Sequence, residues 1–152
     1  ISNITKVNRN IWKLSKDMLL HRSGTKFEDL AYIDEKTGKY EINKDYNAES
    51  RAKPNKKMDA MLKDAEPYTI IGIHNHPGSS VPSMGDLLAC LYRQYKCGVV
   101  VCHDGKIYKY FVDEEKFNQV LAHFALDNLE RTGYTDEVKK QFVDAGVCLE
   151  VL

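Results

Sequence analysis

Two histidines and an aspartate are the residues of this chain best suited to chemistry. His74 and His76 flank one residue at the end of a short apolar run, and Asp86 lies ten residues after the second histidine. Alternate side chains of a strand point to the same face, so both imidazoles would reach one ion. Two histidines and one carboxylate leave a tetrahedral position open for water, as in catalytic zinc sites. Iron accepts the same ligand set, which therefore does not choose the metal.

Ser83 and Asp86 also have a purely structural interpretation. Serine followed three residues later by an acidic residue, just before the apolar Leu87-Leu88, is typical of a capping box at the start of a helix. A metal-bound Asp86 is not expected to bend back fully to the Ser83 amide, so the two roles compete. The histidine pair and the Gly/Ser/Pro loop that precedes Ser83 favour the metal interpretation.

Other metal signatures are missing. The chain has no H-E-x-x-H and no H-x-E with P-C-x-x-C, which argues against a zincin and a zinc deaminase. Its four cysteines form no C-x-x-C pair, so no cysteine zinc site is indicated. Cys90, Cys102 and Cys148 lie among apolar residues and are predicted to be buried free thiols. Free thiols favour a reducing compartment, and we expect a cytoplasmic location.

Hydrophobic periodicity and turn residues predict ten helices and strands, one long loop and a further edge strand. In chain order they are a helix over 9–21, strands over 26–34 and 40–43, a loop over 44–55, a helix over 58–65, a buried strand over 69–73, a helix from 83, strands over 98–102 and 106–112, helices over 114–131 and 136–145, and an edge strand over 148–152. This order predicts an α/β fold in which helices sandwich a mixed sheet.

Composition excludes several function classes. The chain has 22 Lys and Arg against 22 Asp and Glu, so direct nucleic-acid binding lacks electrostatic support. The basic run Arg51, Lys53, Lys56 and Lys57 is interpreted as a solvated helix face. No apolar stretch is long enough to span a membrane, and no signal peptide is recognised. We expect one domain over 1–152, and the start at Ile1 is compatible with a fragment of a longer protein.

The sequence His74-Asn75-His76-Pro77, followed by Pro82-Ser83 and by Asp86, resembles the metal-binding motif of the JAMM (MPN-plus) metalloprotease family. The His-Asn-His-Pro form is most similar to the bacterial branch with RadC-like and phage-associated domains. The resemblance runs in element order from the first helix through the 106–112 strand. Six residues separate His76 from Ser83, one fewer than in the family pattern.

This resemblance implies a curved, three-layer fold and a zinc-dependent hydrolysis of peptide or isopeptide bonds. It also implies a glutamate at the junction of the first helix and first strand, where Glu28 stands, whereas Glu35 lies in a turn. Glu28 would act as general base toward a zinc-activated water, and Ser83 would donate a hydrogen bond to the developing oxyanion. Asn75 would point to the opposite face and be structural.

The substrate, a protein or peptide, is not determined by the sequence, and neither is the oligomeric state. The loop over 44–55 is expected to line the site. The alternative to an enzyme is a non-cleaving accessory or protein-binding module of the RadC-like or phage-associated type.

Overall fold

A six-stranded mixed sheet forms the centre of the computed structural model, which describes residues 1–152. The strand order is β2-β1-β3-β4-β5-β6. Only β3 and β4 are parallel, and every other neighbouring pair is antiparallel. The strands are β1 (Leu30–Asp34), β2 (Tyr40–Asn43), β3 (Ile70–His76), β4 (Cys97–Cys102), β5 (Ile107–Val112) and β6 (Val147–Val151).

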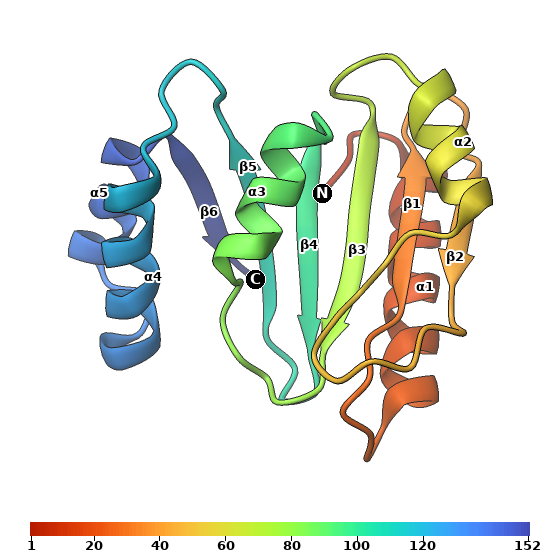
Figure 1. The fold of residues 1–152 in the computed structure, drawn as a ribbon, viewed down its shortest axis with the longest axis horizontal. Helices are drawn as coiled ribbons and strands as arrows, with labels where there is room; N and C mark the ends of the chain where they lie inside the picture. The colour runs from red at the N-terminus through yellow and green to blue at the C-terminus, as the bar shows by residue number, and fades with distance from the viewer.

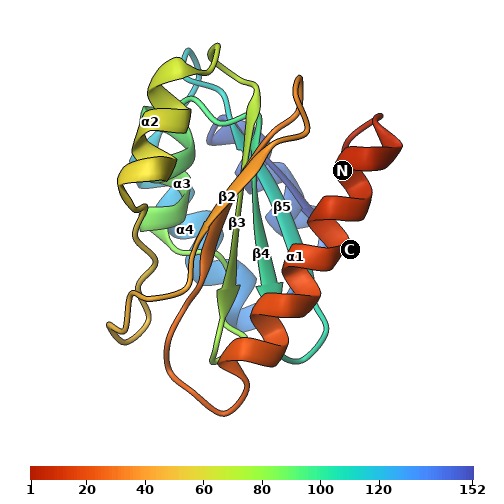
Figure 2. The ribbon, with the colours of Figure 1, turned by 90° about the vertical axis from the view of Figure 1, so that its right-hand side faces the viewer.

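Five helices cover the two faces of this sheet (Figures 1 and 2). They are α1 (Thr5–Arg22), α2 (Lys56–Asp64), α3 (Met84–Tyr92), α4 (Gln119–Thr132) and α5 (Asp136–Asp144). Helix α1 packs alone on one face, whereas the buried side chains of the other four helices join the core on the opposite face. The predicted α/β class with a mixed sheet between helices is confirmed. None of the helices combines the length and the apolar composition that crossing a bilayer requires.

The central strand β3 is buried along its whole length, as its apolar run predicts for a strand covered on both faces. Ile71 and Ile73 belong to the core beneath α1. Because side chains alternate along a strand, His74 and His76 point to the opposite face, toward α3. Asn75, between them, points to the α1 side.

Two glycines shape the α3 side of the sheet. Gly72 of β3 pairs with Gly98 of β4 in the parallel register. A Cβ atom at Gly72 would lie 2.7 Å from the ring of Tyr95, and one at Gly98 would lie 2.2 Å from the ring of Tyr110. The missing side chains therefore leave the space in which two tyrosine rings lie against the sheet.

Several predicted boundaries are wrong. The strand predicted over 26–34 begins only at Leu30. The backbone before it bonds elsewhere: the amide of Asp29 donates to the Asn75 side chain, and Phe27 forms an isolated bridge with Glu49. The helix predicted from 114 begins at Gln119, because the Asn118 side chain caps it.

The cysteine prediction is also partly wrong. Cys90, Cys97 and Cys102 are buried and free, but Cys148 is exposed. The reason is the edge strand β6, along which buried and exposed side chains alternate. Burial raises the pKa of the thiol to about 12 at Cys90 and to about 11 at Cys97 and Cys102.

A thiol count tests this arrangement. The native protein is expected to react quickly with Ellman's reagent at Cys148 alone, since the other three thiols are buried and protonated at neutral pH. All four of its cysteines should react after unfolding in guanidinium. Cys148→Ser should abolish the fast native phase, and a fast phase that survives this substitution would contradict the described packing.

Candidate metal centre

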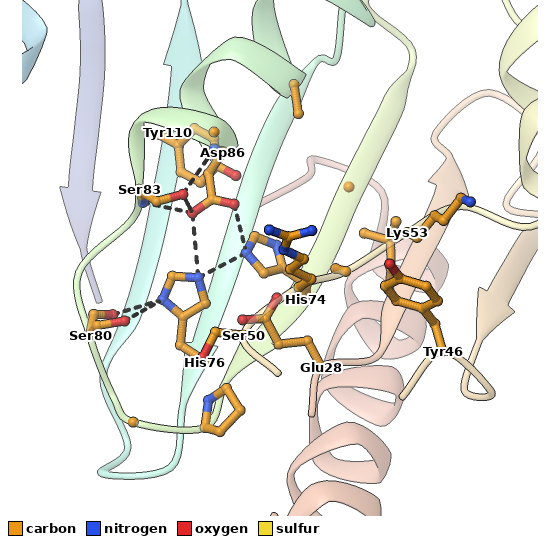
Figure 3. A pocket seen from close by; sticks show the side chains of 18 of the residues that line it. Glu28, Tyr46, Ser50, Lys53, His74, His76, Ser80, Ser83, Asp86 and Tyr110 are labelled. Carbon is orange, nitrogen blue, oxygen red and sulfur yellow. Dashed lines mark hydrogen bonds and ion pairs between the residues drawn. The ribbon is translucent and has the colours of Figure 1, made fainter. Parts of the chain in front are cut away.

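The end of β3 and the first turn of α3 bring together the three predicted ligands (Figure 3). The Nε2 atoms of His74 and His76 lie 3.0 Å apart. Asp86 places Oδ1 3.0 Å from His74 Nε2 and Oδ2 3.4 Å from His76 Nε2. These three residues form a cluster that could hold a metal ion, as the sequence predicts.

The spacing of the donor atoms fits a small cation. Bonds of about 2.0–2.2 Å to a tetrahedral zinc ion separate neighbouring donor atoms by about 3.3–3.6 Å. The distance of 3.4 Å from Asp86 Oδ2 to His76 lies in this range, and the two distances of 3.0 Å, between the imidazoles and from Oδ1 to His74, lie slightly below it. Three protein donors leave one tetrahedral position for water or substrate.

A hydrogen bond at the other ring nitrogen prepares His76 for this role. His76 Nδ1 lies 2.9 Å from the backbone oxygen of Ser80, in the loop between β3 and α3. A carbonyl oxygen only accepts, so Nδ1 carries a proton, and Nε2 is the nitrogen left to face the cluster. The loop thus sets both the tautomer and the orientation of one predicted ligand.

Charge within the cluster is balanced by its own members. Burial alone would raise the pKa of Asp86, but the neighbouring imidazoles of His74 and His76 hold it well below its usual range. Burial likewise opposes the charged form of His76, yet its hydrogen bond to Asp86 raises the pKa of the imidazole. The Asp86 carboxylate is therefore ionised at neutral pH, as a metal ligand must be.

Asp86 forms the capping box with Ser83 that the sequence indicates, and its carboxylate also faces the two imidazoles. The Ser83 amide and hydroxyl both donate to Asp86 Oδ2, at 2.7 and 2.8 Å, and the Asp86 amide donates to Ser83 Oγ at 3.2 Å. Oδ1 is left for His74. Oδ2, which accepts both bonds of the cap, also lies 3.4 Å from His76 Nε2, so the start of α3 and the candidate metal centre share this carboxylate.

Glu28 lies beside the cluster but is not one of its members. Its carboxylate points toward the imidazoles (Figure 3) and lines the same cleft as His74 and His76. The side chain is buried rather than exposed on an edge strand. Burial raises the pKa of Glu28, partly offset by the two imidazoles, which suits a group that takes up and returns a proton.

Glu35, which the sequence places in a turn, does not line this cleft, and neither do Glu41 and Glu49. Glu35 follows β1 at its far end, where it forms an ion pair with Lys96 and accepts a hydrogen bond from Ser2. Those partners lower the pKa of Glu35 against the opposing effect of burial. Glu41 lies in β2, and Glu49 pairs with Lys26 at the surface.

Asn75 holds the backbone on both sides of Glu28. Its Oδ1 accepts from the Asp29 amide at 2.8 Å, and its Nδ2 donates to the Phe27 carbonyl at 3.2 Å. The side chain also lies 3.3 Å from Nε2 of His103. Thus β3 presents the two imidazoles to the cleft with alternate residues, and uses the residue between them to position the segment that carries Glu28.

A buried ion pair strengthens the same segment. The fully buried Asp29 carboxylate accepts from Arg22 Nε at 2.6 Å and lies 2.7 Å from Nδ1 of His21. Arg22 further donates to the Lys44 carbonyl and to Asn47, which joins the end of α1 to the loop over 44–55. Breaking such a buried pair typically costs about 3–5 kcal/mol.

The cleft around the cluster has a volume of about 500 Å³. The loop over 44–55 lines it, as expected, with Tyr46, Ser50, Arg51, Ala52 and Lys53. Arg51 and Lys53 therefore do not belong to a solvated helix face. Sequence reasoning missed Arg93, Tyr95 and Tyr110 on the opposite wall. Of these three residues, only Arg93 could have been found from the sequence. It follows Asp86 by seven residues, a spacing that returns to the same side of a helix.

Comparison with protein-family models, with curated proteins and with solved structures found no significant match. The interpretation of the site therefore depends on its own geometry and on the motif residues.

Metal binding is the first test of this cluster. We expect the protein to bind one zinc ion per chain in equilibrium dialysis followed by elemental analysis. His74→Ala, His76→Ala and Asp86→Asn each remove a donor atom, and each should weaken zinc binding by more than about 100-fold, the upper range for losing a hydrogen-bond partner of a ligand.

His123→Ala is the matched control, because this histidine is exposed on α4, and it should leave zinc affinity unchanged. Retention of zinc by the Asp86→Asn and His76→Ala proteins would rule out this ligand set.

The Asn75 interaction gives a second test. Asn75→Ala leaves the Asp29 amide and the Phe27 carbonyl without their partner, and each buried unpaired group costs about 1–3 kcal/mol of the free energy of unfolding. Zinc affinity should change little, since the Asn75 side chain faces away from the ligands. Asn128→Ala, which breaks a half-buried hydrogen bond to Gln141 on α5 and an exposed one from Arg131, leaves no buried group unpaired and should cost only about 0.5–1.5 kcal/mol. Urea unfolding measures both, and equal losses would show that Asn75 has no special role.

Proposed function

We propose that this protein is a zinc-dependent hydrolase of the JAMM type that cleaves a peptide or isopeptide bond. The observation that carries the proposal is the meeting, in one cleft, of His74, His76 and Asp86 with the buried carboxylate of Glu28. A single metal site with an open coordination position, and an adjacent carboxylate of raised pKa, are together sufficient to activate a water molecule.

The donor set favours zinc. Two imidazoles and one carboxylate that leave a position open for water are a ligand set of catalytic zinc sites, and iron is the other metal that accepts the same three donors. A zinc ion held by these residues would lower the pKa of a water molecule and polarise the carbonyl group under attack.

Glu28 is proposed to move the proton. Its carboxylate takes the proton from the attacking water at one oxygen and returns it to the nitrogen of the leaving amine, which balances the reaction. Burial raises the pKa of Glu28, which makes the carboxylate a better acceptor for this proton than an exposed glutamate. Asn75, by fixing the backbone before and after Glu28, keeps the carboxylate directed into the cleft.

Ser83 is proposed to stabilise the oxyanion. Its hydroxyl has one hydrogen, which is now directed at Asp86 Oδ2. Donation to a substrate oxygen therefore requires the hydroxyl to turn away from Asp86, while the Ser83 amide retains its bond to the same carboxylate. One such donor typically contributes about 3 kcal/mol to transition-state stabilisation.

Glu28→Gln is the decisive variant. Zinc-loaded protein is incubated with a diverse library of peptides and isopeptides, and new termini are identified by mass spectrometry. We expect cleavage that stops when a chelator is added. Its rate should fall about 10²–10⁴-fold in Glu28→Gln, because the amide cannot accept the proton. The variant should bind zinc like the native protein, as the ligands are untouched.

Glu35→Gln is the control, since this glutamate lies outside the cleft, and it should cleave normally. Absence of any cleavage by the zinc-loaded native protein would reject the hydrolase and leave a binding module. Full activity of Glu28→Gln would reject the assigned base.

A further inference from the structure

Arg93, immediately after α3, lies half-buried in the wall of the cleft. Its Nη1 donates to the hydroxyl groups of Tyr32 and Tyr95, both at 3.1 Å. Tyr95 in turn donates to Tyr32 at 2.6 Å, and both tyrosines are buried. The guanidinium is thus held in place by neutral hydroxyl groups, which accept hydrogen bonds but do not compensate its charge.

Three of the five N–H groups of this guanidinium have no partner in the chain. No buried polar side-chain atom of the protein lacks a hydrogen bond, so these groups are open to the cleft rather than sealed in the core. A half-buried cation without a carboxylate partner is costly. The planar fork of Nε and Nη2 matches the two oxygens of a carboxylate.

Helix α3 sets the distance between the Arg93 guanidinium and the candidate metal centre. Asp86 and Ala89 lie on one face of α3, and Arg93, four residues after Ala89 at the end of the helix, lines the cleft with them. Seven residues of helix span about 10 Å, and side chains lean toward the helix start, which brings the guanidinium closer to Asp86. An extended peptide covers this distance in about three residues.

Acidic and basic side chains occupy different parts of the cleft. Its acidic members, Glu28 and Asp86, both lie at the candidate metal centre. Its cations are Arg93 and, from the loop over 44–55, Arg51 and Lys53. Lys53 lies over the ring of Tyr46, at 5.8 Å from its centre. The chain as a whole is neutral, so this excess of positive charge is local.

We propose that Arg93 binds a carboxylate of the substrate, and that the preferred substrate carries an acidic group within about three residues of the bond to be cut. This inference rests on the proposed hydrolase function in one respect: the bond to be cut is taken to lie at the candidate metal centre. The carboxylate belongs either to an Asp or Glu side chain or to the C-terminus of a peptide. Both present the same pair of oxygens to the guanidinium.

Binding to metal-free protein tests the carboxylate site separately from hydrolysis. In EDTA, which prevents a peptide carboxylate from binding zinc, Gly/Ser hexapeptides with one Glu are compared with their Gln counterparts at each position. Peptides with a free C-terminus are compared with their amides. We expect the peptides of one carboxylate series to bind about 10-fold tighter, or more, than their neutral counterparts, because of a charge-assisted hydrogen bond. The series that shows this difference tells whether Arg93 binds a side-chain or a C-terminal carboxylate.

Arg93→Gln should abolish this preference, whereas Arg131→Gln, on the exposed surface of α4, should retain it. Because Arg93→Gln also disturbs Tyr32 and Tyr95, the native protein provides a second measurement: the Nε–H resonance of Arg93 should shift on titration with the preferred peptide. Equal binding of acidic and neutral peptides, including no binding by either, would overturn the proposal. So would a preference that survives Arg93→Gln or disappears only in Arg51→Gln.

Discussion

Three polar side chains meet where a buried strand ends, and the rest of the site depends on how they satisfy one another. His74 and His76 are buried, and Asp86 is drawn to both. Buried polar groups are costly unless they are paired, and a buried carboxylate is stable only beside positive charge. The imidazoles of His74 and His76 hold the pKa of Asp86 low, and a divalent cation held by the three side chains would supply positive charge directly. The arrangement of these three side chains therefore favours the binding of a cation between them.

Strand β3 organises both sides of this arrangement. Its even-numbered residues face α3 and offer the imidazoles, while Asn75 crosses to the α1 side and holds the backbone around Glu28. The buried Arg22–Asp29 pair then ties that backbone to the end of α1. A single run of residues thus couples the general-base candidate to the ligands through the sheet, so displacement of β3 would disturb all of them together.

Helix α3 makes a comparable connection between stability and chemistry. Its first turn is closed by the same Asp86 that faces the histidines, and its last residue is followed by Arg93 in the wall of the cleft. The cap favours the carboxylate at the helix N-terminus, where the helix dipole is positive. The same placement keeps one carboxylate oxygen directed at the imidazoles, so helix formation orders a ligand before any ion binds.

The sequence by itself determined the features that arise from local pattern. The apolar run before His74 indicated a buried strand, alternation placed both imidazoles on one face, and Ser83 with Asp86 marked the start of a helix. The order of elements gave the mixed α/β sheet. Only the tertiary structure decided that Glu28 lines the cleft, that Asn75 bonds to the backbone around it, that Arg93 lies in the cleft wall and that Cys148 is exposed. Each depends on contacts between distant segments, such as the Asp29 amide with Asn75, 46 residues apart. Local patterns do not encode such pairings, because they are selected by packing of the whole sheet.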